Sequence, residues 1–237
     1  MNLYRLRDLQ FTAPYFSAMD CILSGDGKDA IYCSTELTTG KSAYKAMLDN
    51  NVHTIDELDD VDKKIFKRVK EGNKQAAAVF ASKVRAEHKD GTMIINPAPL
   101  ERPGWEQNEY YAFWDELIRT RVKQIRFNDE WEFSNGCTYE LAVALDEDIP
   151  ILDSKGDSLA PKNAITAIED ALQWLHHQGF DEALKKLRRH RDFCRQILER
   201  KETKVSMTLT PDLQRAGKRS ARPPKGAKNS VGAAGPK

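Results

Sequence analysis

Several features that mark particular classes of protein are missing from this sequence of 237 residues. Its four cysteines lie far apart and form no C-x-x-C pair, which disfavours a zinc knuckle or a dithiol redox motif and is typical of reduced thiols. No apolar run approaches the roughly 20 residues that a membrane helix needs. Arg5, Arg7 and Asp8 follow the first methionine without an apolar segment, so no secretory signal is expected. The sequence therefore predicts a soluble, cytoplasmic protein that does not bind membranes.

Acidic residues are missing from the C-terminal end. The chain has 37 Lys and Arg residues, and seven of them lie in residues 215–237, which hold none of the 36 acidic residues. Residues 1–214 are left with 30 basic against 36 acidic side chains, a net charge of −6. Residues 1–214 are therefore not expected to bind nucleic acid, whereas the basic segment 215–237 could contact phosphate groups weakly.

Short apolar runs alternate with helical patterns along the middle of the chain. The runs predict strands at 29–34, 92–97, 123–127 and 149–153, and apolar residues at spacings of three and four predict helices between them. The predicted helices are 42–49, 55–88 with a break near Gly72 and Asn73, 105–122 and 135–145. This alternation predicts an α/β, Rossmann-like fold with a mostly parallel sheet flanked by helices.

The same patterns divide the chain into four parts. Residues 1–28 form a leader, and residues 29–160 form the α/β domain, in which 55–88 is a helical insertion. Two amphipathic segments, 161–178 and 180–201, predict a C-terminal helical hairpin within 161–202 that could pack on the sheet or on another subunit. Residues 203–237 lose the helical period and become rich in Pro, Gly, Ala and Lys, which predicts a disordered basic tail.

The predicted topology brings several loops together. In open parallel sheets the ligand crevice lies outside the carboxyl ends of the strands. The loops expected there are 34–41, the Asn96-Pro97 turn, and the segment 128–140. The crevice is thus predicted from strand order alone.

The segment from Trp131 to Ala144 carries the clearest chemical signal. Ser134 is a suitable N-cap for the helix that follows, and Gly136 allows the backbone to come close to a ligand at the helix N-terminus, which favours anions such as phosphate. Glu140 lies about one and a half turns into this helix, beside small apolar residues. A carboxylate placed in this way can attack or stabilise a sugar C1 atom, which is one plausible use among several.

Three other features leave alternatives open. Gly40-Lys41-Ser42 resembles the end of a P-loop, but position 35 is Thr where that motif has its first glycine. The loop either caps a helix or faces a substrate without the P-loop mechanism, and we favour the second interpretation. Asp115 is by its spacing an ordinary boundary acid, and the aromatic residues of its helix are mostly core, with base stacking as the minority alternative.

The residues around Glu140 also carry a family resemblance. The run from Trp131 to Ala144 resembles the nucleoside 2-deoxyribosyltransferase-like superfamily, and is particularly similar to its branch of deoxynucleoside 5′-monophosphate N-glycosidases and CMP hydrolases. Members of that branch have a Ser, a Gly two residues later and then a Glu at the spacing of Ser134, Gly136 and Glu140. The resemblance implies that Glu140 is the nucleophile at the sugar C1′ atom and that Ser134 and Gly136 bind the 5′-phosphate.

Other segments extend this resemblance over roughly residues 29–157. Segment 94–100 and the helix containing Asp115 look like small uncharacterised members, many of them phage-borne. Asp115 matches the approximate position of the acid that handles the leaving base in the family. The hydrolase branch has a phosphate-clamping arginine where this chain has Leu37, and Lys41 could take its place. Tyr32 and Asn96 are further pocket candidates.

Two functions of different classes follow from these features. The leading hypothesis is an enzyme, an N-glycosidase or deoxyribosyltransferase, that cleaves or transfers at the N-glycosidic bond of a (deoxy)nucleoside or its 5′-monophosphate. It needs no metal and no cofactor, and the resemblance implies a homo-oligomer. The alternative is a non-catalytic nucleotide-binding or accessory protein of DNA metabolism, in which the basic tail contacts nucleic acid and Glu140 carries out no reaction.

Overall fold

The computed structural model describes residues 29–61 and 63–219, so the predicted leader 1–28 and the tail beyond residue 219 lie outside the described residues. The chain divides into two compact units, residues 1–198 and 199–237. The first unit contains the whole sheet and the cavity described below. The described part of the second unit consists of the last portion of one long helix.

The sheet has four strands in the order β2-β1-β3-β4. These strands are β1 (Ala30–Ser34), β2 (Ile94–Ile95), β3 (Val122–Phe127) and β4 (Ile151–Leu152). All three pairings are parallel, with Tyr32 of β1 beside Ile95 of β2 on one side and Ile125 of β3 on the other. The predicted α/β, Rossmann-like fold with a parallel sheet is confirmed, although β2 and β4 are shorter than the apolar runs suggested.

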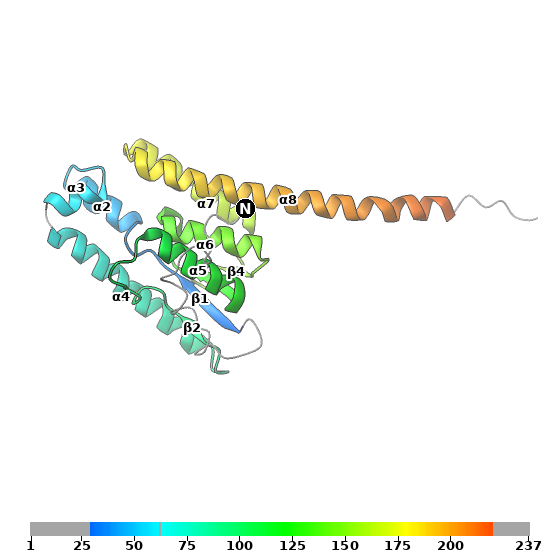
Figure 1. Ribbon diagram of the computed structural model, residues 1–237, viewed down its shortest axis with the longest axis horizontal. Helices are drawn as coiled ribbons and strands as arrows, with labels where there is room; N and C mark the ends of the chain where they lie inside the picture. Colours follow the sequence, from blue (N-terminus) through cyan, green and yellow to red (C-terminus); the bar gives the residue numbers. More distant parts are fainter. Residues whose placement is uncertain (1–28, 62, 220–237) are drawn as a thin grey trace, which may run out of the picture. The chain divides into compact units, whose positions relative to one another are not determined.

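The helices occupy the segments between and after these strands. In chain order they are α2 (Lys41–Asp49), α3 (Ile55–Val61), α4 (Lys63–Glu87), α5 (Gln107–Arg121), α6 (Asn135–Asp146), α7 (Pro161–His177) and α8 (Asp181–Arg219), with a 3₁₀ turn η2 (Trp131–Phe133) before α6. Figure 1 shows α4 on one side of the sheet, away from α5 and α6. No helix among the described residues is both long enough and apolar enough to span a membrane.

Alternate residues of β1 face two different sets of helices. Ile31 and Cys33 pack with Ile94 and with α4 residues such as Phe80 and Val84. Ala30 and Tyr32 belong to the larger core, which contains residues from α5, α6, α7 and α8. This alternation with a period of two is what a strand covered on both faces requires.

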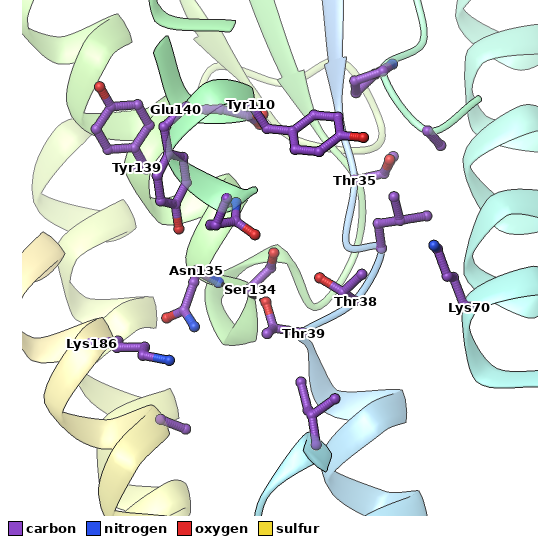
Figure 2. A pocket seen from close by; sticks show the side chains of 18 of the residues that line it. Thr35, Thr38, Thr39, Lys70, Tyr110, Ser134, Asn135, Tyr139, Glu140 and Lys186 are labelled. Carbon is purple, nitrogen blue, oxygen red and sulfur yellow. Dashed lines mark hydrogen bonds between the residues drawn. The ribbon is translucent and has the colours of Figure 1, made fainter. Parts of the chain in front are cut away.

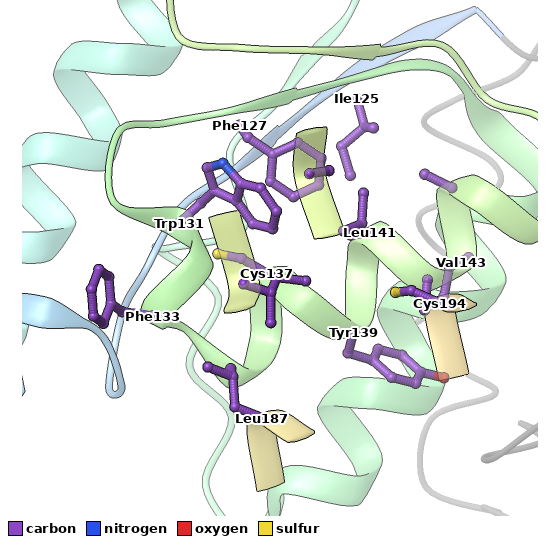
Figure 3. Packing of buried hydrophobic residues seen from close by; sticks show 14 of the residues in the cluster. Ile125, Phe127, Trp131, Phe133, Cys137, Tyr139, Leu141, Val143, Leu187 and Cys194 are labelled. Atoms are coloured by element: carbon purple, nitrogen blue, oxygen red, sulfur yellow. The ribbon is translucent and has the colours of Figure 1, made fainter. Parts of the chain in front are cut away.

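Helix α6 is deeply buried. All of its residues from Cys137 to Leu145 are buried, because the sheet lies on one side and helices on the other. Figure 3 shows Cys137 and Leu141 of this helix between Ile125 of the sheet and Leu187 of α8. A helix that is buried all round is normally apolar, so the glutamate in its middle needs a specific polar environment.

Two helix boundaries differ from the sequence-based expectation. The insertion 55–88 is helical over Ile55–Val61 and Lys63–Glu87, but α4 runs through Gly72 and Asn73, so the predicted break near these residues is wrong. The helix continues because Asn73 is held by tertiary contacts: its Nδ2 donates to the Leu37 carbonyl at 3.0 Å, and its Oδ1 lies 3.0 Å from the Ser42 hydroxyl, whose single proton is shared with Glu36.

The second difference concerns the C-terminal hairpin. Helices α7 and α8 form the predicted pair, but α8 continues to Arg219 instead of ending near residue 201. The prediction that the chain is disordered from residue 203 is therefore wrong as far as Arg219. Glu199, Arg200, Lys201 and Glu202 all favour helix, so the helix extends although its apolar period is lost.

The N-terminus of α2 is occupied by a side chain from the preceding loop. The carboxylate of Glu36 accepts a hydrogen bond from the Lys41 backbone N–H at 3.1 Å and another from the Ser42 hydroxyl at 2.8 Å. Burial raises the pKa of Glu36, and these two hydrogen bonds partly oppose that rise. Because the carboxylate takes the place that a phosphate has in a P-loop, Gly40-Lys41-Ser42 does not form one.

We predict that Gly40→Ala destabilises the protein. Gly40 has φ +150°, and an added Cβ would lie 1.8 Å from Glu36 Oε2. The backbone conformation alone should cost about 1–3 kcal/mol, and displacement of Glu36 should add to that cost. The free energy of unfolding, measured with a chemical denaturant, provides the test.

Gly72→Ala is the matched control. An added Cβ at this helical position meets no atom within 4 Å, so the substitution should stabilise the protein by about 1 kcal/mol. Equal stabilities for the two variants would contradict the proposed role of Gly40 beside Glu36.

Candidate active site

The carboxylate of Glu140 is held by two hydroxyl groups from β1. Tyr32 Oη donates to Glu140 Oε1 at 2.7 Å, and Ser34 Oγ donates to Glu140 Oε2 at 2.6 Å. Residues 32 and 34 of one strand point to the same face, which explains how both reach one carboxyl group. Glu140 is only 8% exposed. The strand β1 therefore supplies two donors to one buried carboxylate of α6.

Burial changes the acidity of this group. Removal from water raises the pKa of Glu140 to about 7, although the hydrogen bonds from Ser34 and Tyr32 favour the charged form and lower it. The pKa of Tyr32 is raised well above its ordinary value, first by burial and then by the charge of Glu140. Tyr32 thus stays protonated as a donor, while Glu140 exchanges between its acid and its carboxylate near neutral pH.

Glu140 lines a cavity of about 460 Å³ in the first unit. This volume is in the range of small-molecule pockets. Its walls come from the loops that follow β1 and β2, from the start of α6, and from α4, α5 and α8. The predicted convergence of the loop 34–41, the Asn96-Pro97 turn and the segment 128–140 is confirmed, since Pro97 also lines the cavity. Thr35, Thr38 and Thr39 show that the loop 34–41 faces the cavity (Figure 2).

The N-terminus of α6 opens into this cavity. Ser134 caps the helix as predicted, since its hydroxyl accepts from the Cys137 N–H at 3.4 Å. The Asn135 N–H donates to Thr39 Oγ1 at 3.2 Å. The Gly136 N–H has no acceptor among the residues that the structure describes. This amide remains available to a ligand, in a position where the helix dipole favours negative charge.

Gly136 also leaves space beside this amide. A Cβ built at this position would meet only the Ser134 hydroxyl, at 3.8 Å, and the residue lines the cavity. The protein itself does not need a glycine there, because an alanine would fit the backbone. The open space is consistent with the predicted close approach of a ligand.

One wall of the cavity is aromatic. It consists of Tyr110, Tyr111 and Trp114 of α5 together with Tyr139 of α6. Trp114 makes an edge contact with Tyr32, with ring centres 5.6 Å apart, and Tyr111 lies 4.6 Å from Tyr139 between ring centres. These contacts fix the rings in place. A flat heterocyclic ligand can stack on such a wall.

Asp115 lies behind this wall. It is buried but does not line the cavity. Its carboxylate accepts from Arg119 Nε at 2.9 Å and from the Tyr139 hydroxyl at 3.0 Å. Asp115 is therefore separated from the cavity by the aromatic wall. Its predicted role in acid–base chemistry is untested, and the route from it to the cavity passes through Tyr139.

Asn96 and Lys41 also do not line the cavity, and neither does Tyr32, which contacts the cavity residue Glu140 instead. Asn96 Oδ1 accepts from the Ala98 N–H at 3.1 Å and so stabilises its own turn. Lys41 Nζ forms an ion pair with Glu130 at 2.8 Å and lies 5.1 Å from the centre of the Phe133 ring. Whether Lys41 replaces the family's arginine stays a prediction, because a phosphate would have to compete with Glu130.

Three residues of the site were not singled out from the sequence. Ser34 could have been found from its position two residues after Tyr32, since alternate residues of a strand share a face. Asn135 follows the N-cap, and its Oδ1 is buried without a partner. Tyr139 precedes Glu140, and its link to Asp115 depends on the packing of α5 against α6, which sequence spacing does not reveal.

The side chains around Glu140 are of the kinds that bind organic ligands. Among the described residues, no group of three or more His, Cys, Asp or Glu side chains is arranged to hold a metal ion. Hydroxyl, amide and aromatic groups predominate around Glu140. Such groups bind sugars, bases and phosphates.

Comparison with known proteins identifies no relative of this chain. No protein-family model matches it, and neither does any curated protein or solved structure. The resemblance around Glu140 therefore rests on the named residues alone, and the geometry of the site has to carry any functional conclusion.

We predict that Ser34→Ala raises the pKa of Glu140 above about 7. The Ser34 hydroxyl favours the charged carboxylate, so its loss leaves burial less opposed. The titration of the Glu140 carboxyl carbon, followed by NMR and assigned with Glu140→Gln, measures the change. Ser42→Ala is the control, because Ser42 donates to Glu36 instead. An unchanged Glu140 titration in Ser34→Ala would contradict this role.

Proposed function

We propose that the protein cleaves or transfers at the N-glycosidic bond of a (deoxy)nucleoside or its 5′-monophosphate, with Glu140 as the nucleophile. The observation that carries the proposal is the Glu140 carboxylate, which is buried, bonded to two hydroxyls and placed in the wall of a cavity. No cationic side chain among the described residues is hydrogen-bonded to it. Its charge is therefore not neutralised by a salt bridge.

The environment of Glu140 suits covalent catalysis. A carboxylate oxygen attacks C1′, the C1′–N bond breaks, and its electron pair leaves with the base, which takes up a proton. The glycosyl ester that forms on Glu140 is uncharged, so burial favours it over the carboxylate. Water, or the N–H group of a second base, then attacks C1′, the bond between C1′ and the Glu140 oxygen breaks, Glu140 leaves as a carboxylate, and the attacking group gives up one proton. The two outcomes are hydrolysis and transfer.

Tyr32 and Ser34 orient the nucleophile in this scheme. Each holds one oxygen of the carboxylate through a single hydroxyl proton, and each carboxylate oxygen has a second lone pair for C1′. Asp115 retains its proposed acid–base role only through Tyr139, whose hydroxyl it binds and which lines the cavity. The leaving base would then receive the Tyr139 hydroxyl proton, and Tyr139 would recover a proton from the water or second base that attacks C1′.

The remaining walls match the other parts of a nucleotide. The aromatic wall of Tyr110, Tyr111, Trp114 and Tyr139 suits the base. The Gly136 N–H and the Ser134 hydroxyl at the start of α6 suit a 5′-phosphate. The aromatic wall and the start of α6 line the same cavity as Glu140, which would face the sugar between the base and the phosphate.

A binding protein without turnover is the second candidate. One observation favours it: both oxygens of Glu140 already accept hydrogen bonds within the protein, as in a carboxylate that only stabilises the fold. Such a protein would hold a nucleotide in the same cavity and act as a sensor or an accessory factor. Product formation separates the two candidates.

We predict that Glu140→Gln abolishes release of the free base from the preferred nucleoside or monophosphate. Glutamine keeps the size of the side chain but has no carboxylate, so the rate should fall by roughly 10³-fold or more. Chromatography of a panel of nucleosides and 5′-monophosphates, with and without an acceptor base, gives the rate. For the wild-type protein, kcat/KM should rise with pH through about 7, because the ionised form reacts.

Glu71→Gln is the control, because this exposed glutamate on α4 does not line the cavity. Its rate should match the wild type. Saturable nucleotide binding by the wild-type protein without any product would contradict the enzyme and favour the binding protein.

We predict opposite effects of Gly136→Ala on stability and on phosphate binding. Alanine favours helix by about 1 kcal/mol over glycine and meets no close atom here, so the free energy of unfolding should not fall. The added methyl group occupies the space beside the free amide, so monophosphate affinity should fall roughly tenfold while nucleoside affinity changes less. Calorimetric titration of both ligands provides the measurement. Equal losses for the two ligands would place the phosphate elsewhere.

A further inference from the structure

The cavity continues beyond the N-terminus of α6. Glu140 follows the cap residue Ser134 by about 9 Å along the helix axis, and its side chain leans back toward that end. A sugar and one phosphate therefore suffice to reach from Glu140 to the free Gly136 amide. The cavity does not stop there, because Thr38, Ile55 and Lys186 also line it.

We call this outer part of the cavity the outer compartment. Its walls come from the loop after β1, the start of α3, the start of α6 and the first turns of α8; the residues used here are Thr38, Ile55, Asp56, Asn135, Ala183 and Lys186. Figure 2 shows Asn135 and Ser134 between Glu140 on one side and Lys186 on the other. A ligand that fills the whole cavity would pass the helix N-terminus.

Asn135 carries an unpaired hydrogen-bond acceptor at the outer compartment. The residue is 8% exposed, and its Oδ1 atom is buried without any hydrogen-bond partner. A buried acceptor left unpaired costs about 1–3 kcal/mol, and such atoms are rare in native proteins. The atom accepts hydrogen bonds only, so a fully ionised phosphate cannot satisfy it. A ligand hydroxyl group can, once the amide of Asn135 turns toward the cavity that this residue lines.

Lys186 lines the same compartment, together with the carboxylates of Asp56 and Glu182. Its Nζ atom lies 2.8 Å from Glu182 Oε1, and the two side chains are 60% and 62% exposed. An exposed pair of this kind contributes little to stability and exchanges partners readily. Lys186 can therefore turn to an anionic ligand at small cost.

From these observations we propose that the substrate extends past the first phosphate as a nucleoside 5′-diphosphate ester. The second phosphate faces Lys186, and the hydroxylated group that it carries donates to Asn135 Oδ1. This inference rests on the proposed function, because it takes the sugar to be at Glu140 and the first phosphate to be at Gly136. It names the substrate class of that same cavity.

The test is a set of calorimetric titrations of the Glu140→Gln protein, which should bind without turnover. The monophosphates first identify the preferred base, and the matching diphosphate and diphosphate sugar are then titrated. The diphosphate sugar should bind at least tenfold more tightly than the monophosphate. Lys186→Gln, added to the same protein, should reduce this ratio roughly fivefold or more.

Two further variants make the test specific. Lys185→Gln alters the neighbouring exposed lysine of α8, which does not line the cavity, and should keep the ratio. Asn135→Leu removes the unpaired acceptor at similar size, so the diphosphate sugar should lose its advantage over the diphosphate while the diphosphate keeps its advantage over the monophosphate.

Each adverse outcome has a distinct meaning. Equal affinities for the monophosphate and the diphosphate sugar would overturn the inference, and monophosphate cleavage by the wild-type protein would leave the proposed function standing. An advantage that survives both Lys186→Gln and Asn135→Leu would overturn the assignment to the outer compartment. Absence of binding to every nucleotide would overturn the inference and the proposed function together.

Discussion

The contact of Glu140 with Tyr32 and Ser34 is the interaction on which the site depends. Helix α6 is buried on all sides, and its one glutamate sits where an unpaired charge is costly. The two hydroxyls of β1 lower this cost but do not remove it, since the pKa of Glu140 remains raised to about 7. The carboxylate is thus held in place without a salt bridge, and it can lose its charge to a proton or to a sugar carbon.

Two helices that follow strands of the sheet, α2 and α6, differ in what occupies their N-termini. At α2, Glu36 accepts from the first turn and requires Gly40 to be a glycine. At α6, the Gly136 amide is left without an acceptor, and the adjoining space is open. The start of α6 is therefore open, whereas the start of α2 is occupied by Glu36. This difference explains why the chain contains a fragment of a P-loop motif without its mechanism.

The sequence predicted the elements better than their contacts. Apolar periods and the positions of Gly and Pro gave the order of strands and helices, and the capping residue and spacing identified Ser134 and Glu140. The continuation of α4 past Gly72 depends on the tertiary hydrogen bonds of Asn73, and the confinement of Asp115 depends on Arg119 and Tyr139. The apolar periodicity of a single helix gives no information about its hydrogen bonds with other elements. The unpaired acceptor of Asn135 can be recognised only when the residues that surround it in the fold are known.

The central claim is that a sugar becomes bonded to Glu140 during the reaction. Mass spectrometry of the protein, quenched during turnover of its preferred substrate and then digested, measures this bond directly. The account predicts that the mass of one glycosyl group is added to the peptide containing Glu140 and that the addition is absent in Glu140→Gln. Turnover at the wild-type rate in Glu140→Gln, or a glycosyl group attached to a different residue, would contradict it.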